Sequence, residues 1–466
     1  MTQQLYDTRQ QALVDFAPLR DGEVSMYVCG PTVQSAPHVG HLRSALVYDQ
    51  IRRWFAHEGY RVTLVRNVTD IDDKTLANAT EHEPWWALAY RVEREFTAAY
   101  AALRIQPPTY EPRATGAIPE MQAIIARLIE RGHAYAAEDG VYFDTASWVD
   151  YGELTRQRPA DMVAAEDGAE RGKRSAQDFA LWKGRKEGEP DSAAWDSPWG
   201  PGRPGWHIEC SAMSTKYLGA EFDIHGGGRD LRFPHHENEL AQSRAAGDGF
   251  ARHWIHNGLV SLGGTKMSKS VGNIVSATDL LAERRPIVVR YLFGSAHYRS
   301  TIELSDEAYA EAQSSFERIE HFLDRAGRLV GGVEPAASLP ASYAEAMRDD
   351  FAVPQALAVV HGTVTAGNQA IEEGDRALVA ELAASVRGML GILGVDPLAE
   401  EWADAGTGDS KLEPVLDSLI RELLEQRAAA RGARDWAAAD RIRDGLTAAG
   451  ITIEDTPQGS HWSVNE

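Results

Sequence analysis

The sequence predicts an α/β protein in which a doubly wound parallel sheet is followed by a helical bundle and a small C-terminal domain. Three observations lead to this fold class. Strand-like and helix-like apolar segments alternate near the N-terminus, a long stretch after residue 300 is almost wholly helical in pattern, and an acidic segment of small residues precedes the last 56 residues. The length of 466 residues suits roughly two to four packed units.

The first β-α-β unit spans residues 24–68. Val24 to Cys29 is a short apolar run that ends at Gly30, and apolar residues then recur at helical spacing until Gly59. Tyr60 to Val68 predicts the next strand. Because strand, helix and strand of this length imply parallel pairing with a crossover, we expect a Rossmann-like sheet.

An inserted segment at about residues 108–200 interrupts this first unit, whose limits we predict as 1–300. Apolar residues at helical spacing over 118–129 predict an amphipathic helix, and the pattern from Ala134 to Asp144 predicts a hairpin. Two stretches without a regular pattern bound the insertion as loops: 157–176 and 188–205.

The chain after the first unit is expected to be helical. Ser305 predicts an N-cap near the start of a helical bundle over 301–397, and the acidic residues 398–410 form the predicted linker. Residues 411–466 predict a small domain with two helices, the second running from Asp435 to Gly450. The apolar face of this second helix has Trp436, Ala439, Ile442 and Leu446.

The composition is that of an ordinary globular protein, with 43% hydrophobic and 25% charged residues. The first twenty residues lack the basic start and apolar run of a signal peptide, and no 18-residue apolar stretch occurs. We therefore expect a cytoplasmic protein that does not enter a membrane. The two cysteines lie 181 positions apart and are expected to stay reduced in that compartment.

The charge balance is strongly acidic, because 47 basic residues face 69 acidic ones and the net charge is −22. Phosphate backbones bind basic surfaces, so any contact with nucleic acid must be local. A large net negative charge bears on solubility and association rather than on fold.

The first motif is His38-Val39-Gly40-His41, placed where the first strand hands over to the first helix. Backbone N–H groups at a helix N-terminus form an anion site, and Gly40 removes a side chain so that a flat base or a phosphate can approach. In isolation the pattern also suits two surface histidines near a helix cap. The residues alone leave both interpretations open.

The second motif runs from Gly263 to Asn273 and contains KMSKS at 266–270. Glycines at both ends make the segment mobile, and Lys266 and Lys269 with the neighbouring serines suit a loop that folds over a triphosphate. The alternative is a solvated linker.

A third, scattered set consists of Cys29, Cys210, His235 and Glu239. Pro234 suits the first turn of a helix, so positions 235 and 239 project from one face while His236 and Glu237 point elsewhere. Two thiolates, an imidazole and a carboxylate make a sensible zinc shell. A cysteine is also often a small buried hydrophobe, so spacing alone leaves the metal open.

The order of the first two motifs resembles the two signatures of class I aminoacyl-tRNA synthetases. Longer segments resemble cysteinyl-tRNA synthetases, and the resemblance covers nearly the whole chain, including the tail. These segments are MYVCGPTV, RNVTDIDDK, PGWHIECSAMS, FDIHGGGRDLRFPHHENELAQS and KMSKSVGN. Val39 stands where that family more usually has Ile, which is a conservative change.

The resemblance implies an enzyme that uses ATP, with Mg²⁺, to activate L-cysteine as an adenylate and then transfers it to the 3′ end of cysteine tRNA. In that family the substrate thiolate binds one Zn²⁺ held by two Cys, one His and one Glu, which fall on Cys29, Cys210, His235 and Glu239. An apolar pocket separates near-isosteres such as cysteine and serine by only about 10–200-fold. A thiolate on Zn²⁺ therefore supplies discrimination without an editing domain.

The resemblance also implies the residues that handle ATP. His38 and His41 would contact the phosphates, and Gly40 would lie beside the nucleotide. Lys266 and Lys269 would neutralise the β- and γ-phosphates as negative charge moves onto the leaving pyrophosphate.

Further residues follow from the same resemblance. Asp230 would accept hydrogen bonds from the ribose, and Thr69 and Trp206 would line the cysteine pocket, although either is also compatible with a purely structural place. In this reading 1–300 is the catalytic domain and 411–466 recognises the anticodon. The anticodon residues would be Arg431, Asp440 and Asp455, for which solvated surface positions are the alternative.

Two rival functions remain. A ligase that joins cysteine to a small amine, a pseudoglycoside, resembles this core but is expected to lack the helical tail, which is present here. A catalytically inactive nucleotide- or RNA-binding relative is disfavoured because both nucleotide motifs keep their histidines and lysines. We expect the protein to be a monomer.

Overall fold

A computed structural model describes residues 2–157, 172–262, 265–266, 275–403, 409–456 and 459–464. The chain forms two compact units, Met1–Trp402 and Ala403–Glu466. Within the described ranges, no helix is both long enough and apolar enough to cross a lipid bilayer.

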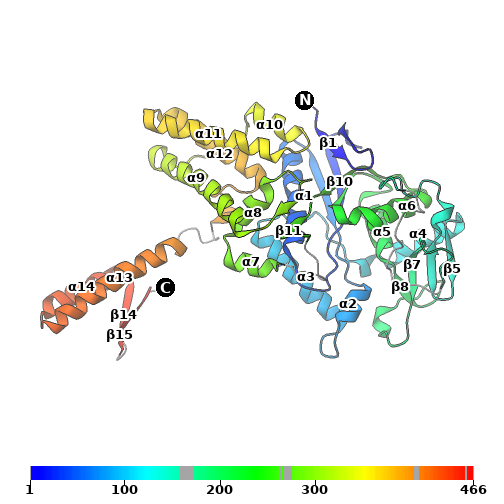
Figure 1. Ribbon diagram of the computed structural model, residues 1–466, viewed down its shortest axis with the longest axis horizontal. Helices are drawn as coiled ribbons and strands as arrows, with labels where there is room; N and C mark the ends of the chain where they lie inside the picture. Colours follow the sequence, from blue (N-terminus) through cyan, green and yellow to red (C-terminus); the bar gives the residue numbers. More distant parts are fainter. Residues whose placement is uncertain are drawn as a thin grey trace. The chain divides into compact units, whose positions relative to one another are not determined.

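The core of the first unit is a four-stranded parallel sheet (Figure 1). Its strands, in spatial order, are β10 (Phe250–Asn257), β9 (Glu221–Gly228), β3 (Glu23–Val28) and β4 (Arg61–Arg66). The chain crosses from β3 to β4 through helix α1 (Val39–His57), and from β9 to β10 through helix α6 (Glu237–Ala245). Because these crossovers run in opposite directions from the β3–β9 pair, the doubly wound fold predicted from the sequence is confirmed.

Helix α1 forms where apolar residues recur at helical spacing, and that face is buried against the sheet. Leu42, Leu46 and Trp54 are fully buried on it. The helix ends at His57, and Gly59 follows with a φ of 92°, a left-handed conformation that favours glycine. This glycine turns the chain directly into β4.

The insertion forms a separate antiparallel sheet. Its strands, in order, are β5 (Ala134–Ala137), β6 (Gly140–Phe143), β7 (Phe179–Gly184) and β8 (Gly202–Pro204). Helix α4 (Ile118–Glu130) buries its apolar face in the same core, as the sequence predicts. β8 lies inside 188–205, which was expected to be a loop. Its three residues include Gly and Pro, so pairing with β7 defines this strand and local propensity does not.

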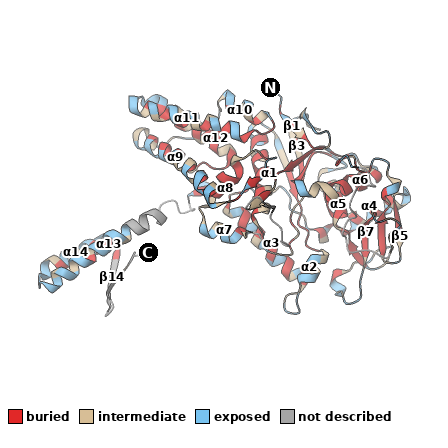
Figure 2. Cartoon of the chain, viewed as in Figure 1, coloured by how far each residue is buried: buried red, intermediate tan, exposed pale blue. Residues whose placement is uncertain are grey.

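Further helices complete the described part of the first unit. They are α2 (Asp73–Asn78), α3 (Trp85–Ala102), α5 (Trp206–Leu218), α7 (Ala277–Glu283), α8 (Pro286–Ser295), α9 (Asp306–Val330), α10 (Ala341–Arg348), α11 (Val353–Glu373) and α12 (Arg376–Leu393). Ser305 caps α9, because its Oγ accepts a hydrogen bond from the Ala308 N–H at 3.1 Å. In Figure 2 buried residues follow the inner faces of α9, α11 and α12, as expected for a packed bundle.

Two small sheets were not predicted. Strands β1 (Gln4–Asp7) and β2 (Ala12–Asp15) form an N-terminal hairpin. Strand β11 (Val260–Leu262) pairs with β12 (Thr265–Lys266) and with β13 (Ile302–Glu303). These strands have two to four residues each, too few for a clear alternation of apolar and polar side chains.

The second unit has two helices and a hairpin: α13 (Asp409–Gly432), α14 (Trp436–Ala448), β14 (Ile451–Thr456) and β15 (Gly459–Val464). Ile420, Leu424, Leu446 and Ile451 form its core. Trp436 was expected on the apolar face of α14, yet it is 59% exposed, and Trp462 of the hairpin packs against the core. In the predicted linker 398–410, Trp402 is buried in the first unit and its Nε1 donates to the Gly394 carbonyl.

Candidate active site

A cleft of about 370 Å³ opens beyond the carboxyl ends of β3 and β9, where the direction of winding changes. In doubly wound folds ligands bind at this point, because the loops on either side diverge. Residues singled out from the sequence that line the cleft are Cys29, His38, Gly40, His41, Trp206 and Asp230. The fold therefore brings together residues that are up to 201 positions apart in the sequence (29 to 230).

The first motif caps helix α1. His38 is the N-cap: its Nδ1 accepts from the Gly40 N–H at 3.1 Å, and His41 Nδ1 accepts from the His38 N–H at 3.2 Å. The two imidazole rings stack with their centroids 3.8 Å apart. A Cβ on Gly40 would lie 2.9 Å from the His38 ring, so glycine permits this reciprocal cap. Both histidines thus stand at the positive end of α1, on the wall of the cleft.

The donor atoms of Cys29, Cys210, His235 and Glu239 all lie within 4.8 Å of one another. Cys29 Sγ is 3.6 Å from Cys210 Sγ and 3.3 Å from Glu239 Oε1, and the same oxygen is 3.1 Å from His235 Nε2. Cys29 faces the cleft, whereas the other donors are buried behind it. Two sulfurs, one nitrogen and one oxygen at this spacing fit a tetrahedral Zn²⁺.

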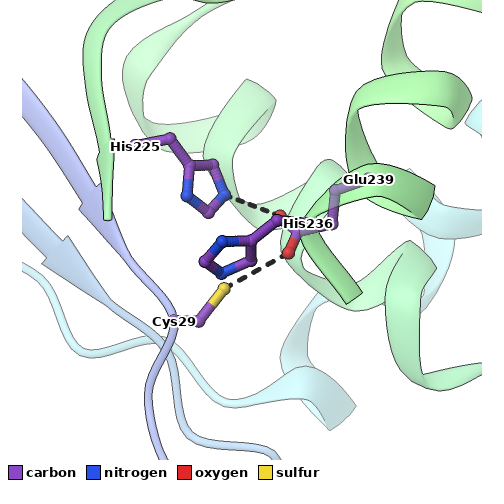
Figure 3. Close-up of side chains that lie close together, drawn as sticks. All are labelled: Cys29, His225, His236 and Glu239. Carbon is purple, nitrogen blue, oxygen red and sulfur yellow. Dashed lines mark hydrogen bonds and ion pairs between the residues drawn. The ribbon is translucent and has the colours of Figure 1, made fainter. Parts of the chain in front are cut away.

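A second set of donors overlaps the first and consists of Cys29, His225, His236 and Glu239 (Figure 3). In Figure 3 the Glu239 carboxylate contacts both a thiol and an imidazole. One of its oxygens contacts Cys29 Sγ, and the other lies 2.8 Å from His225 Nε2. The first set has two thiols and the second has one. Since thiolate-rich shells suit Zn²⁺, we propose the first set as the ligands and His225 as the residue that orients Glu239.

The expectation that His236 points away from the metal residues is wrong. Residues Arg232–His236 form a π-helical turn in which Phe233 leaves the helical region, so the regular helix α6 begins only at Glu237. This change of winding turns His236 toward Cys29 and Glu239. Glu237 does point elsewhere, because its carboxylate accepts from the Thr155 N–H at 2.8 Å.

Burial sets the protonation of the proposed ligands when no metal is bound. It raises the pKa of the Cys29 and Cys210 thiols, and it lowers the pKa of His235 to about 3. His235 Nδ1 lies 2.9 Å from Nδ1 of His207, so one of these rings donates to the other. The neutral imidazole is the form that binds a metal, and a divalent cation would favour the thiolates that burial disfavours.

Trp206 and Thr69 occupy different environments. Trp206, in the first turn of α5, stacks on His235 with ring centroids 4.1 Å apart and lines the cleft. Thr69 is 1% exposed and is not part of the cleft wall. Its hydroxyl donates to Glu209 Oε2 at 2.7 Å and accepts from Asn67. The structure therefore places Trp206 at the cleft and Thr69 below its floor.

The glycines of the HGGGRD segment make room for neighbouring rings. A Cβ on Gly226 would lie 2.3 Å from the Tyr48 ring, and a Cβ on Gly227 would lie 2.8 Å from His236. Gly228 and Asp230 line the cleft. Gly226 and Gly227 therefore serve packing, while Gly228 and Asp230 at the end of the segment reach the cleft.

The remaining candidates are less fully described. Lys269 lies outside the described residues, and the backbone of Lys266 lies in β12 while its side chain is outside them. Arg431 is exposed in the last turn of α13, and Asp440 on α14 is 58% exposed and pairs with Arg443 at 3.0 Å. Asp455 lies in β14, and its side chain is not described.

Comparison with known proteins supplies independent evidence. Residues 15–314 match the family described as "tRNA synthetases class I (C) catalytic domain", residues 342–397 match the "DALR domain", and residues 413–462 match the "Cysteinyl-tRNA ligase anticodon binding domain". Among curated proteins, the chain is 64% identical over 484 aligned residues to the cysteine–tRNA ligase of Clavibacter sepedonicus, and 61% identical over 477 to that of Leifsonia xyli subsp. xyli. Both alignments cover 100% of each chain.

A solved structure shares the fold at much lower identity. Methionyl-tRNA synthetase of Mycobacterium tuberculosis, solved with methionyl-adenylate, aligns with a TM-score of 0.57 at 17% identity and covers 80% of this chain and 90% of its own. The catalytic fold is thus that of class I synthetases. With a family match over residues 15–314 and full-length relatives above 60% identity, the chain belongs to the cysteinyl-tRNA synthetase family of class I aminoacyl-tRNA synthetases.

Proposed function

We propose that this protein activates L-cysteine with ATP and transfers it to the 3′ end of cysteine tRNA. The observation that carries the proposal is the buried group of two thiols, an imidazole and a carboxylate that opens, through Cys29, into the cleft at the N-terminus of α1. A thiol-selective group and an anion site in one cleft suit a substrate pair of cysteine and ATP.

Residues of the cleft divide the work of activation by position. His38 and His41, at the positive end of α1, hold the phosphates, and Gly40 leaves space for their approach. Asp230 accepts hydrogen bonds from the ribose. The reaction is an in-line attack of the cysteine carboxylate on the α-phosphate, so these residues act mainly by orienting the reactants. Lys266 and Lys269 complete the proposal as counter-charges for the leaving pyrophosphate.

The proposed Zn²⁺ ligands are Cys29, Cys210, His235 and Glu239. Bound there, the ion would take the substrate thiol as a thiolate by lowering its pKa. Trp206, which stacks on His235 and lines the cleft, would form part of the wall of the cysteine pocket. The hydroxyl of serine stays neutral near pH 7 and does not form an anion as the thiol of cysteine does. Serine is therefore rejected at the amino acid binding step. Thr69 is proposed to shape the cysteine pocket from below its floor, where its hydroxyl donates to Glu209 Oε2.

The second unit is proposed to read the anticodon. Arg431 and Asp440 are exposed on α13 and α14, where a charged side chain can reach the edge of a splayed base. Asp455 completes the proposed set. We also propose that the enzyme is a monomer in the cytoplasm, with Mg²⁺ accompanying ATP.

Amino-acid-dependent pyrophosphate exchange tests the proposal directly. Cysteine should support exchange with a kcat/KM more than about 200-fold above that of serine, because an apolar pocket alone does not exceed that ratio. Charging of total tRNA with labelled cysteine should follow. A cysteine to serine ratio near ten would mean that no metal contacts the substrate. Exchange without tRNA charging, together with formation of a cysteinyl amide of an amino sugar, would favour the small-molecule ligase.

A further inference from the structure

A network of four charged side chains joins the insertion sheet to helix α2. One oxygen of Asp73, the first residue of α2, forms an ion pair with Arg203 of β8, and the other lies 2.7 Å from Nζ of Lys183 of β7. The Arg203 guanidinium also donates to Glu189 Oε2 at 2.8 Å. Two cations and two carboxylates therefore form one balanced group where α2 meets the insertion (Figure 1).

The two cations of this network depend on the Asp73 carboxylate. The side chains of Arg203 and Lys183 are only 2% and 8% exposed. They are also paired residues on neighbouring strands, where like charges repel. Partial burial raises the pKa of Asp73, but Lys183 and Arg203 outweigh it and lower the pKa to about 2. Asp73 is thus an ionised carboxylate that both cations share.

Arg203 lies three residues before Trp206, and the chain between them is held against β7. The Gly205 N–H donates to the Leu181 carbonyl at 2.9 Å. A Cβ on Gly205 would lie 1.9 Å from a carbonyl oxygen of β7, so the backbone packs directly on that strand. Trp206 follows as the first residue of α5. The position of β8 therefore sets the position of the Trp206 ring, which stacks on His235.

Helix α2 also contacts the loop that follows β3. Its last residue, Asn78, donates through Nδ2 to the main-chain carbonyl of Gln34 at 3.0 Å and to Gln34 Oε1 at 2.8 Å. Gln34 lines the cleft, as does Lys74 in the first turn of α2. The six residues of α2 thus connect the loop that contains Cys29 with the strand that precedes Trp206.

We infer that Asp73 is a positioning residue for the cysteine pocket, because it fixes Arg203 and, through β8, the place of the Trp206 ring in the cleft wall. This inference rests on the proposed function, which puts Trp206 in the wall of that pocket. Asp73 is not among the described residues that line the cleft, so it acts through its neighbours and not by contact with a substrate.

Pyrophosphate exchange at varied cysteine and ATP concentrations tests the inference. Asp73→Asn keeps the size of the side chain but turns an amide donor toward one of the two cations. It should raise the KM for cysteine about tenfold and leave kcat and the KM for ATP within about twofold, because only the cysteine side of the cleft is displaced. Asp73→Glu keeps the charge and should restore most of the loss.

A milder variant addresses the Arg203 side of the network. Arg203→Lys keeps the positive charge but cannot reach Asp73 and Glu189 at once, since it lacks the guanidinium fork. It should raise the KM for cysteine by about threefold, again without a change in the KM for ATP.

Asp248→Asn is the matched control. Asp248 pairs with Arg127 of the insertion helix α4 at 2.8 Å and does not belong to the Asp73 network. Both Asp→Asn variants remove a carboxylate that holds the insertion, so both should lower the melting temperature. Only Asp73→Asn should change the KM for cysteine, and both variants should keep the zinc content of wild type.

A double-mutant cycle determines whether Asp73 acts through Trp206. Trp206→Ala alone should raise the KM for cysteine. Adding Asp73→Asn to it should raise this KM by less than about twofold more, because the ring whose place depends on Asp73 is already absent.

Several outcomes would overturn the inference. An unchanged KM for cysteine in Asp73→Asn or in Trp206→Ala would show that the network does not set the pocket wall. Equal increases in the KM for cysteine and for ATP, or the same increase in Asp248→Asn, would indicate general loosening of the insertion. Multiplicative effects in the double mutant would make Asp73 independent of Trp206. If wild type supports no cysteine-dependent exchange, the proposed function fails first and the inference with it, which the wild-type assay reveals before any variant is compared.

Discussion

Four histidines that the sequence analysis did not assign pack around the proposed metal ligands: His207, His225, His236 and His256. Burial lowers the pKa of His207 and His256 to about 3 and that of His236 well below its ordinary value, so these three rings are neutral near pH 7. A neutral ring donates with one nitrogen and accepts with the other. The rings therefore fix one another and the ligands without adding positive charge beside a cation.

Zinc content should distinguish the two donor sets. Cys210 and His235 belong to the first set only, and His236 belongs to the second set only. We expect wild type to hold about one Zn²⁺ per chain, Cys210→Ser and His235→Gln to hold well below half of that, and His236→Gln to retain most of it. Plasma emission spectrometry after gel filtration measures the ratio.

His133→Gln is the matched control, because His133 is partly buried and contacts Ser147 at 2.9 Å, outside both donor sets. It should keep its zinc. If His236→Gln lost the metal while Cys210→Ser kept it, the second donor set would be the binding site.

At the residue scale, spacing and the two cysteines singled out Cys29, Cys210, His235 and Glu239, and the resemblance to the family implied their role as ligands. The structure brings the four donors together, and the metal stays a prediction. The sequence did not locate the supporting histidines. His256 comes from β10 and reaches His236, while Thr8 near the N-terminus holds the other nitrogen of His256. Such contacts depend on which strands are neighbours, and no local spacing encodes them. The sequence did not predict the burial of Thr69 for the same reason, because its partner Glu209 is distant in the sequence.

Helix α1 links the cleft to the helical part of the first unit. Asp49, in the middle of this helix, is 2% exposed, forms an ion pair with Arg290 of α8, and accepts from the Gln106 N–H at 2.9 Å. Arg290 also donates to the carbonyls of Leu393 at 3.0 Å and Leu103 at 2.9 Å. One buried ion pair thus fastens α1 to the ends of α12 and α3.

Asp49→Asn should lower the free energy of unfolding by about 3 kcal/mol near neutral pH, because Arg290 would keep a buried charge without its counter-ion. Burial alone raises the pKa of Asp49, but the charges of Arg290 and Arg53 outweigh it and lower the pKa below its ordinary value. The pair therefore stabilises the fold above about pH 4, and its contribution is lost as the pH falls through the lowered pKa. Urea titrations across pH should show the gap between wild type and variant closing in acid.

Asp324→Asn is the control for this ion pair. Asp324 pairs with Arg328 on the surface of α9, with 55% and 75% of the side chains exposed. Its loss should change the free energy of unfolding by less than about 0.5 kcal/mol at any of these pH values. Equal effects of the two variants would mean that burial adds nothing to the Asp49 pair.

At the element scale, the predictions were confirmed where the periodic pattern of apolar residues extends over a long segment. Helix α1 and strands β3 and β4 follow the alternation in residues 24–68, and α9 begins after the predicted cap Ser305. The predictions failed for β8 and for the small sheets, which have two to four residues per strand. These strands exist because a partner strand is already in place, which is tertiary information.

At the scale of the whole molecule, the second unit has its own apolar core, so removing it should spare activation and impair charging. A chain ending after Ala403 should keep cysteine-dependent pyrophosphate exchange within several-fold, since the residues proposed for activation precede residue 275. Aminoacylation should fall at least about 100-fold, because contacts that orient the tRNA are lost. Steady-state kinetics of both reactions provide the measurement.

A chain ending after Pro397 is the matched control for folding. It lacks Trp402, whose buried indole donates to the Gly394 carbonyl at 3.1 Å. This shorter chain should melt at a lower temperature than the one ending after Ala403. Charging of cysteine tRNA by the Ala403 form at the wild-type rate would rule out anticodon reading by the second unit.

The order of the whole chain was largely predictable, because a doubly wound sheet, a helical region and a helical tail each have a distinct composition. The boundary between the first and second units was harder to predict. Acidic composition favours a linker over 398–410, yet Trp402 packs on the first unit, and a single buried indole does not change the average of the segment.

Because β3 lies between β4 and β9, its two neighbouring strands become available at different times during synthesis of the chain. Residues 61–66 leave the ribosome soon after β3, but residues 221–228 follow only after the insertion, a delay of roughly 10–40 s at a typical rate of synthesis. Until then one edge of β3 has no partner strand. Cys29, just after β3, is then present without the other three proposed ligands. The proposed metal site is complete only after residue 239 has been synthesised, so under this proposal metal binding follows the synthesis of β9, the strand that pairs with the free edge of β3.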